Sequence, residues 1–554
     1  MSSELPSVNP PAGAGPLPLA EQRPVMAEVL PREERDGRRD QRPVSHREIF
    51  AVLLLVILSD ATIYRGEGFA GYAAFFLAAP LLFWLGAPLP RVSKSVLLLG
   101  LMLILLAARA AWCGSLLLVA SGFALLVGFA MAMAGLRPYV LEGAVFASQT
   151  VLAGYEGLRH YRRSSRQRGT AVSRGAWLDY GLPLAAFVAF GLLFIVANPD
   201  LLTSFGETLE RIFTALRDWI IEFSPSWREI LFWIAVLWIS VGLLRPVVTR
   251  SLLELEEKAP SKPPAAAEPV QAFFYVPFRN TLVTVIALFA VYLVFEFKSL
   301  WFRVFPEGFY YSGYAHEGAA WLTVALGLAT VVLSLIFRGE ALRDPRLFRL
   351  RRLAWIWSLE NLLLAVAVYH RLYIYVGFNG MTRMRMVGLF GMSCVVAGFI
   401  LVVWKIVHNR DFVWLFRRHL WALALAVYLF ALTPVDVIVH SYNVRRILAG
   451  DPAPSVQISV HPISSEGLLV LPPLLESGDP IIREGVRAML ADRLDEGESL
   501  ARQQQQAGWT AYQIGDLAAL QRLRLESPKW AELRNRPKRQ AALKRFHEYA
   551  YQWY

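Results

Sequence analysis

Charged and polar residues fall inside or beside long apolar stretches at a few places in this chain. A charge within a membrane helix costs on the order of 2.5 to 3.5 kcal/mol on insertion scales, so such a residue usually faces a cavity or a partner. The positions where a proton or a cation could be handled are Asp60, Glu360, Asn361, His370, Asp436 and His440. Asp436 and His440 are four residues apart and therefore share one face of a helix. These six residues are the candidates for chemistry inside the membrane.

A structural role competes with a chemical one at several of these positions. Glu296 ends an apolar stretch and has Lys298 two residues further on. Asp436 and His440 close the last apolar stretch, near enough to the outer interface for water to solvate them. A polar group that water or a neighbouring charge satisfies needs no ligand. For these residues we weight the structural interpretation above the chemical one.

Glu360, with Asn361 beside it, is the exception because it is predicted to lie deepest. It follows the start of its apolar stretch at Leu353 by seven residues, which is about 10 Å at 1.5 Å per residue. A carboxylate at that depth cannot reach bulk water unaided, so we expect either a cavity or a structural partner from another helix. Arg109 and Lys405 are candidates for that partner if their depth matches. We favour the structural alternative.

Three arginines at outer ends of apolar stretches run against the rule that Lys and Arg gather on the cytoplasmic side. They are Arg371, Arg383 and Arg385. Gly377 and Gly380 permit a tight turn between them, and Thr382 can cap the helix that follows. We expect Arg383 and Arg385 to hold an anionic lipid or a carboxylate from another span, and Arg371 to contact an anionic group or a lipid.

Signatures of common catalytic and metal sites are missing from the sequence. It contains no Gly-rich loop ending in Gly-Lys-Ser or Gly-Lys-Thr, no His-Glu-x-x-His and no Gly-x-Ser-x-Gly. The nine histidines are scattered, and Cys113 and Cys394 are too few for a disulfide framework or a Cys-based metal site. We therefore expect no catalytic residue, no metal site and no cofactor, and we favour a non-enzymatic role.

About eleven apolar stretches, each long enough to cross a bilayer, fill residues 50–440. Spanning roughly 30 Å of hydrocarbon takes about 20 apolar residues as a helix. We place the spans near 50–65, 68–87, 95–111, 115–136, 177–197, 229–249, 280–297, 319–337, 353–376, 386–407 and 420–440. With 55% hydrophobic and 18% charged residues, the chain is too apolar for a soluble protein. The predicted fold class is an all-α, multi-pass transmembrane helical bundle with a small soluble helical C-terminal domain.

Arginine placement predicts the orientation of these spans. The loop 159–174 carries Arg159, Arg162, Arg163, Arg166, Arg168 and Arg174 with no acid between them, so we place it in the cytoplasm. Counting spans from this loop places the N-terminus in the cytoplasm and residues 441–554 outside. The stretch 139–157 is interpreted as interfacial because polar residues interrupt it. Arginines at helix ends explain most of the net charge of +12, so no nucleic-acid partner is expected.

Composition divides the chain into five segments. Residues 1–46 are predicted to be a disordered cytoplasmic tail. Residues 47–253 form a first membrane half of about six spans, with the basic loop 159–174 and an amphipathic outer helix at 200–223. A Pro/Ala-rich linker at 254–279 leads to a second half of about five spans at 280–440. Residues 441–554 have mixed charge and form the soluble domain, in which Asp479 caps a helix that starts with Pro480.

Three segments together resemble a known family. They are Tyr311-Ser-Gly-Tyr-Ala-His-Glu-Gly318, the loop from Arg371 to Arg383 with Arg385, and Tyr442-Asn-Val-Arg-Arg446. They are similar to motifs of a bacterial family of polytopic membrane proteins, catalogued as domain of unknown function 4173 and related to 4153. This chain departs from the family pattern, with Gly380-Met381-Thr382 in place of Gly-Leu-Thr and Asn379 in place of Tyr. The resemblance spans about residues 50–500 and implies a topology but no activity.

These observations favour an uncharacterised integral protein of the bacterial inner membrane that acts as an envelope scaffold or sensor. The expected partners are the lipid bilayer and, through residues 441–554, other envelope proteins. A solute or lipid permease is an alternative, although the internal repeats and paired broken helices common in transporters are missing. A membrane transferase acting on lipid-linked substrates, with an outer carboxylate such as Asp436 as base, is a second alternative.

Overall fold

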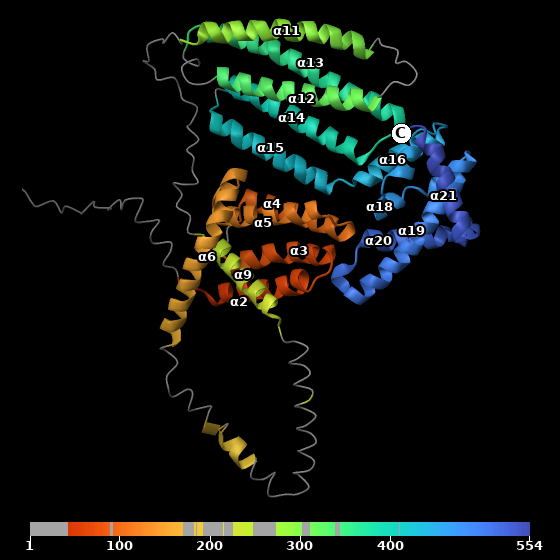
Figure 1. Cartoon of the computed structure of the whole chain (residues 1–554). Coiled ribbons are helices and arrows are strands. Elements are labelled where there is room, and N and C mark those ends of the chain that lie inside the picture. The colour runs from red at the N-terminus through yellow and green to blue at the C-terminus, as the bar shows by residue number, and fades with distance from the viewer. Residues whose placement is uncertain are drawn as a thin grey trace, which may run out of the picture. The chain divides into compact units, whose positions relative to one another are not determined.

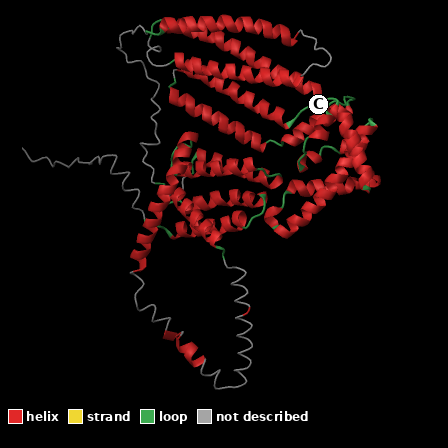
Figure 2. Ribbon diagram, in the orientation of Figure 1, coloured by secondary structure: helices red, strands yellow, loops and turns green. Residues whose placement is uncertain are grey.

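The computed structural model describes residues 43–88, 92–169, 182–183, 185–191, 214, 225–246, 273–301, 311–337, 344–408 and 410–554. Within these ranges every element is a helix and no strand occurs (Figure 2). The predicted all-α class is thereby confirmed. The tail up to residue 42, the outer helix at 200–223 except residue 214, most of the linker 254–279 and most of the span at 177–197 lie outside the described residues.

The region predicted as the first membrane half contains six long α-helices among the described residues, four of which begin at serine caps. They are α2 (His46–Ser59), which continues into the π-helix η2 (Asp60–Tyr64), α3 (Phe69–Gly86), α4 (Lys94–Trp112), α5 (Leu116–Met133), α6 (Val140–Gly169) and α9 (Trp227–Leu244). The side chains of Ser45, Ser93, Ser115 and Ser226 accept hydrogen bonds from backbone N–H groups in the first turns of α2, α4, α5 and α9. These caps satisfy donors that a helix end would otherwise leave without a partner.

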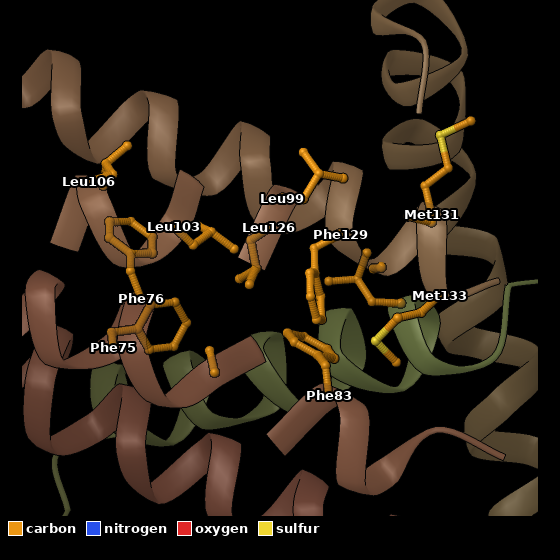
Figure 3. Packing of buried hydrophobic residues seen from close by; sticks show 14 of the residues in the cluster. Phe75, Phe76, Phe83, Leu99, Leu103, Leu106, Leu126, Phe129, Met131 and Met133 are labelled. Atoms are coloured by element: carbon orange, nitrogen blue, oxygen red, sulfur yellow. The ribbon is translucent and has the colours of Figure 1, made fainter. Parts of the chain in front are cut away.

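Aromatic rings and leucines fill the core of this half. Phe76 and Phe83 of α3 pack with Leu103 of α4 and with Leu126 and Phe129 of α5 (Figure 3). Gly122 of α5 lies directly against the ring of Phe76, where a methyl group would have no room. This close approach allows α3 and α5 to pack face to face.

The second half contains α11 (Tyr275–Trp301), α12 (Tyr311–Ile336), α13 (Leu347–Asn379), α14 (Arg383–His408) and α15 (Phe412–Leu432). Helix α13 packs against α11, α12 and α14, and α14 packs against α15 (Figure 1). Helix α15 also contacts α4, α5 and α6, so it joins the two halves. One of these contacts is a hydrogen bond of 2.9 Å from Tyr428 Oη of α15 to the carbonyl oxygen of Met102 of α4.

Eight helices among the described residues are long and apolar enough to cross a membrane: α3, α4, α5, α9, α11, α13, α14 and α15. Helix α12 has a shorter apolar segment, Ala320–Leu333. The chain is therefore a membrane protein in character. The count of eleven spans stays a prediction.

The end of the last span differs from the prediction of 420–440. Helix α15 ends at Leu432, and a separate helix α16 (Val435–Leu448) begins after Pro434. Proline has no N–H to continue the backbone ladder, and its ring displaces the residue before it from helical geometry. Asp436 and His440 therefore lie on α16, outside the candidate spans.

Helix α6, which is 30 residues long, covers residues 140–157 of the stretch interpreted as interfacial, and it packs against α9, α5 and α15. The interfacial position of this stretch stays a prediction. One expectation about the turn before α14 differs from the structure. Gly377 lies inside α13, so the turn depends on Gly380 alone, whose φ of +97° suits glycine.

The C-terminal domain continues from α16 through short helices and has its own apolar core. Its elements are α17 (Ser455–Val460), α18 (Ser465–Leu468), η4 (Pro472–Glu476), α19 (Pro480–Ala507), η5 (Trp509–Ala511), α20 (Ile514–Glu526), η6 (Ser527–Arg534) and α21 (Arg536–Tyr551). Asp479 caps α19 as predicted, because its Oδ1 accepts from the backbone N–H groups of Ile481 and Ile482. One face of α19 packs on Phe546 of α21 in this core. The solubility of the domain stays a prediction.

Candidate functional site

The six candidate residues lie in three separate places. Asp60 lies at the end of α2, Glu360 and Asn361 lie within α13, and Asp436 and His440 lie on α16. His370, further along α13, is half-buried and stacks on Tyr373 with 6.1 Å between ring centroids. No single site gathers these six residues.

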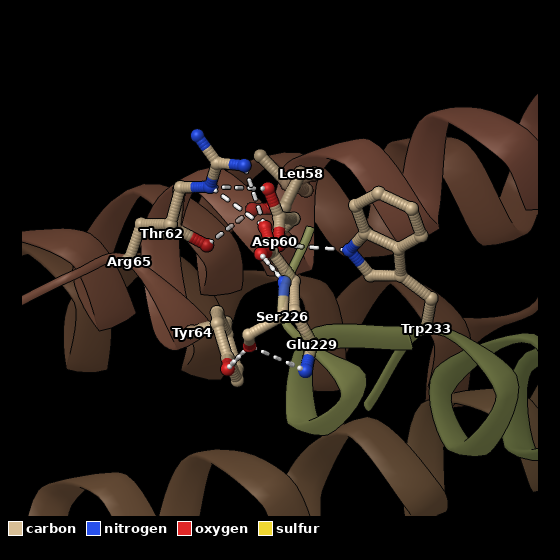
Figure 4. A network of polar contacts seen from close by, with 8 residues as sticks. All are labelled: Leu58, Asp60, Thr62, Tyr64, Arg65, Ser226, Glu229 and Trp233. Atoms are coloured by element: carbon tan, nitrogen blue, oxygen red, sulfur yellow. Dashed lines mark hydrogen bonds and ion pairs between the residues drawn. The ribbon is translucent and has the colours of Figure 1, made fainter. Parts of the chain in front are cut away.

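Asp60 belongs to a polar network between α2 and α9 (Figure 4). Trp233 Nε1 donates to Asp60 Oδ1 at 2.8 Å, and Arg65 Nε lies 3.1 Å from Asp60 Oδ2. Arg65 also donates to Glu229 Oε1 at 2.6 Å, and Glu229 forms a reciprocal cap with Ser226 at the start of α9. Both acids therefore have partners, and the network fastens the π-helix end of α2 to α9.

Asp436 forms an ion pair with Arg383 at the start of α14. Arg383 Nε donates to Oδ1 of Asp436 and Arg383 Nη2 donates to Oδ2. The backbone N–H of Ser464 donates to Oδ2 as well, at 2.8 Å. Burial alone would raise the pKa of Asp436, but the bonds from Arg383 and Ser464 outweigh burial and lower the pKa below its ordinary value. Asp436 is therefore an ionised acceptor that is poorly suited to act as a base.

His440 lies on the same face of α16 and is 3% exposed. Burial lowers its pKa to about 4, and the attraction of Asp436 does not reverse this shift. The imidazole is therefore neutral at pH 7, and its Nδ1 is buried without a hydrogen-bond partner. Gly467 packs directly on this face, since a methyl group there would lie 3.0 Å from both Asp436 Cβ and His440 Cδ2.

The C-terminal domain also binds the first membrane half. Arg109, in the last turn of α4, donates to Glu466 Oε2 and Oε1 at 2.6 and 2.7 Å. The backbone N–H of Gly114 donates to Gln513 Oε1 at 2.7 Å, and that of Glu67 donates to Thr510 Oγ1 at 3.2 Å. We call the set Arg109, Arg383, Asp436, His440 and Glu466 the joint, because it connects both halves to the domain.

The two motifs at 379–385 and 442–446 contact each other beside the joint. Asn443 Oδ1 accepts from the N–H of Met381 at 2.7 Å, and Asn443 Nδ2 donates to the carbonyl of Met381 at 2.9 Å. Arg446 donates to the carbonyls of Val376 and Gly377 at 2.8 and 2.7 Å. The closing Asn-x-x-Arg motif therefore holds the α13–α14 turn in place.

Arg385 is buried in this turn. It donates to the carbonyl of Gly380 and, at 2.5 Å, to Asn379 Oδ1. Its guanidinium also lies 3.6 Å from the ring centroid of Tyr375. Gln457 of α17 donates to the carbonyl of Asn379 at 3.0 Å, which ties the turn to the C-terminal domain. The contacts of Arg385 are with the protein itself.

Arg371 lies inside α13 and pairs with Glu296 of α11. Its Nε and Nη2 donate to Oε1 and Oε2 of Glu296, both at 2.7 Å. Each side chain is under one-tenth exposed. Arg371, which was predicted to contact an outer anionic group or a lipid, therefore has a carboxylate of α11 as its partner.

Two more buried pairs lie at other helix ends. Arg245 at the end of α9 donates to Glu48 at 2.5 and 2.8 Å, and Arg417 of α15 donates to Glu142 of α6 at 2.6 Å. The partners are distant in the sequence, so the sequence alone could not pair them. The sequence does contain one sign of such a pair, which is an acid that interrupts an apolar stretch, as Glu142 does.

Glu360 differs from every acid described above. Its Oε2 is buried without a hydrogen-bond partner, and no ion pair to Glu360 occurs within the part of the chain that the structure describes. The proposed partner Arg109 is engaged by Glu466. The other proposed partner, Lys405, lies only three residues before the end of α14. Glu360 lies well inside its own helix, about 20 Å from the start of α13 at Leu347.

The C-terminal domain contains a cavity of about 230 Å³ between α18, α19 and α20. Its wall is mostly apolar and includes Asp516. The carboxylate of Asp516 accepts from Ser465 Oγ at 2.5 Å and from Gln504 Nε2 at 3.0 Å. Within the described ranges, no group of three or more His, Cys, Asp or Glu residues lies where it could hold a metal ion.

The comparisons with known proteins give one match. The family model described as "Domain of unknown function (DUF4153)" matches residues 72–461. The matched region begins in α3 and ends just after α17, so it includes Arg383, Asp436 and His440. No curated protein and no solved structure matches the chain.

Proposed function

The chain belongs to the DUF4153 family, whose function is unknown, and we propose that it is an inner-membrane protein of the bacterial envelope that acts as a scaffold or sensor. Its membrane region fixes the C-terminal domain at one end of the helices. The domain then offers a surface outside the membrane to envelope partners. A relation to the 4173 family is part of this proposal.

The joint is the observation that carries the proposal. The domain bonds to the first half through Glu466 and to the second half through Asp436. A domain held at both places cannot tumble freely, and it restrains the relative movement of the two halves. Transporters that alternate their access need such movement, so the joint favours a fixed display of the domain. A sensor uses the same joint, because a shift of either half changes the position of the domain.

The contacts also support the proposed orientation. The domain touches the turns at 65–68, 113–115 and 380–382, so these turns share its side of the membrane. In the eleven-span prediction each of these turns follows an odd-numbered span and lies outside, as residues 441–554 do. Between Gly114 and Gly380 the number of crossings must then be even. If α6 does not cross, the described helices α5, α9, α11, α12 and α13 supply five, and the proposal takes the sixth crossing from the span predicted at 177–197.

The transferase alternative loses its proposed base. Asp436 is ionised and both of its oxygens accept bonds from Arg383. A general base works best when its pKa lies near the working pH, and the pKa of Asp436 lies below its ordinary value. The permease alternative keeps one supporting observation, the partnerless Glu360 of α13.

Reporter fusions test the orientation. Alkaline phosphatase fused after Tyr554 should be active, because the proposal places it outside, and the same reporter fused after Arg168 should be inactive. The reverse pattern would overturn the orientation, and equal activity at both sites would overturn the span count.

A deletion strain profiled for envelope stress and lipid composition tests the role. Complementation with Glu466→Ala should fail, because the domain loses its contact with Arg109, while Glu360→Gln and the exposed control Glu476→Ala should complement. Membrane abundance of each variant is measured alongside. The exchanged pair Arg109→Glu with Glu466→Arg should regain part of the function if the joint itself matters. A permease would show the opposite pattern, with Glu360→Gln losing flux of a solute at normal abundance.

A further inference from the structure

Three polar side chains of α13 form one buried face inside the second membrane half. Trp357, Glu360 and Asn361 stand at positions i, i+3 and i+4, which are neighbours on a helix surface. They are 2%, 9% and 0% exposed. Trp357 Nε1, Glu360 Oε2 and Asn361 Oδ1 are all buried without a hydrogen-bond partner. The face therefore presents one unused donor and two unused acceptors.

The orientation of the Asn361 amide is fixed by its own helix. Asn361 Nδ2 donates to the carbonyl oxygen of Trp357 at 2.8 Å. A carbonyl only accepts hydrogen bonds, so turning the amide over would place two acceptors against each other. Asn361 Oδ1 is consequently the atom left without a partner. Ser358 does not compensate for it, because its Oγ donates to the carbonyl of Ala354 at 2.7 Å.

Apolar side chains surround this face. Trp357 meets Phe289 of α11 edge to face, with 5.7 Å between ring centroids, and shares an apolar cluster with Phe399 and Val402 of α14. One turn further along, Leu364 packs with Leu322 of α12 and Met392 of α14. An ionised carboxylate in such surroundings is strongly disfavoured unless a cation is present.

Among the described residues, no charged side chain of the neighbouring helices supplies that compensation. The buried or half-buried titratable side chains described on α11 and α14 are Tyr275, Tyr292, Glu296, Arg385, Cys394 and Lys405. On α13 itself they are Arg351, Tyr369, His370, Arg371 and Tyr375. None of these forms a hydrogen bond or ion pair with Glu360 among the contacts of the described residues. Glu296 and Arg371 satisfy each other.

We propose that Trp357, Glu360 and Asn361 form a hydrated proton-binding site within the second membrane half. A water molecule there donates one hydrogen to Glu360 Oε2 and the other to Asn361 Oδ1, and it accepts the Trp357 Nε1–H. Buried waters typically make about three such bonds to groups that would otherwise lack partners. The donor in the set favours water over a metal cation, since an indole N–H repels a cation.

The proton resides on the Glu360 carboxyl group. Its arrival is a simple transfer, in which hydronium gives a proton to the carboxylate and becomes water, and the O–H bond forms as the other breaks. The water at the site connects the carboxyl group to solvent protons. This site goes beyond the scaffold role and does not depend on it.

Infrared difference spectroscopy of the full chain in lipid nanodiscs tests the site. The spectrum of the wild type minus that of Glu360→Gln should show the carbonyl stretch of a protonated carboxylic acid, and this band should shift after transfer to D2O. Glu296→Gln is the matched control and should leave the band in place, because both oxygens of Glu296 accept hydrogen bonds from Arg371. If Glu360→Gln does not accumulate, Glu360→Asp gives the same readout by displacing the band.

Each result decides the proposal. A missing acid band would show that Glu360 is ionised and would overturn it. A band that does not respond to D2O would show a dry carboxyl group and would overturn the hydration. Trp357→Phe keeps a ring but removes the donor, so it should move the band to higher frequency; an unmoved band would exclude the shared water.

Discussion

The acids of the joint and the acid on the polar face of α13 are all buried, yet they differ in their hydrogen-bond partners. At the joint, Asp436 and Glu466 each receive two bonds from an arginine of another segment. On α13, Glu360 receives none within the described part of the chain. Arginines gather at helix ends, where several segments meet and a long side chain can reach an acid. Arg371 reaches Glu296 inside the bundle in the same way, but among the described residues no arginine or lysine reaches Glu360, so this acid needs another partner.

The comparison also changes how the arginines at helix ends should be interpreted. Arg417 lies in a basic segment that the positive-inside rule alone would explain. In the structure it is buried against Glu142, and its guanidinium lies over the ring of Tyr139 at 4.6 Å from the centroid. The same residue therefore serves both topology and packing.

Glu466→Ala should have the largest effect on stability. It leaves the guanidinium of Arg109 without its acid at a mostly buried site, and breaking such a pair costs on the order of 3 to 5 kcal/mol. Thermal unfolding of the full chain in detergent, with proteolysis to detect release of the domain, measures this loss. Glu476→Ala is the control, because Glu476 pairs with Lys529 on the surface and should change little. Equal melting temperatures for both variants would show that the joint does not stabilise the protein.

His440 should make the joint sensitive to acid. Its folded pKa of about 4 lies below its ordinary value of 6.5, so between these limits the unfolded chain binds a proton that the folded chain does not. Stability is therefore complete above pH 6.5 and falls as the pH drops towards 4, by on the order of 3 kcal/mol. The lowered pKa of Asp436 acts in the same direction, below its ordinary value of 3.8.

Melting temperatures across this pH range test the effect. His440→Phe should reduce the change in melting temperature with pH above pH 4. His461→Gln is the comparison variant, because burial lowers the pKa of His461 as well. A wild-type protein that melts at the same temperature throughout would contradict the assignment of His440.

The sequence predicts most of the membrane helices because their length and apolar character alone define them. The span expected at 95–111 is the helix Lys94–Trp112, and the one at 229–249 is Trp227–Leu244. The helix break at Pro434 was not predicted, because apolar residues continue past Pro434 and a single proline hardly changes the mean hydropathy of the stretch. The interruption places Asp436 on a new helix, where it can meet Arg383.

The pairings at the joint could not be predicted from one sequence. Arg109 and Glu466 are separated by 357 positions, and nothing in either local sequence indicates the other. The position of Glu360 inside a helix could be predicted from residue count, although the helix begins at Leu347 and not at Leu353. The depth of Glu360 in the membrane stays a prediction. The lack of a partner for Glu360 could not be predicted, since that depends on which side chains three other helices bring to α13.

Gly380→Ala should weaken the turn beside the joint by about 1 to 3 kcal/mol, because a side chain is strained at φ of +97°. The new methyl group would also lie 2.5 Å from Asn443 Oδ1. Gly377→Ala is the matched control: it stands inside α13 with open space around it, so it should stabilise the helix by about 0.5 to 1 kcal/mol. Opposite shifts in melting temperature are expected. Shifts of the same sign would mean that the turn does not depend on the backbone of Gly380.

Glu360→Gln should have the smallest effect, and its contrast with Glu296→Gln sharpens the whole comparison. Glutamine keeps the shape of a neutral carboxyl group and can still bond to water, so we expect a change within about 1 kcal/mol. Glu296→Gln removes the negative charge that faces the buried Arg371 and should cost on the order of 3 to 5 kcal/mol. Both melting curves are recorded for the full chain in the same detergent. If Glu360→Gln loses as much stability as Glu296→Gln, Glu360 carries a charge that a cation compensates. The acid on α13 and the acids of the joint would then both be held by ion pairs.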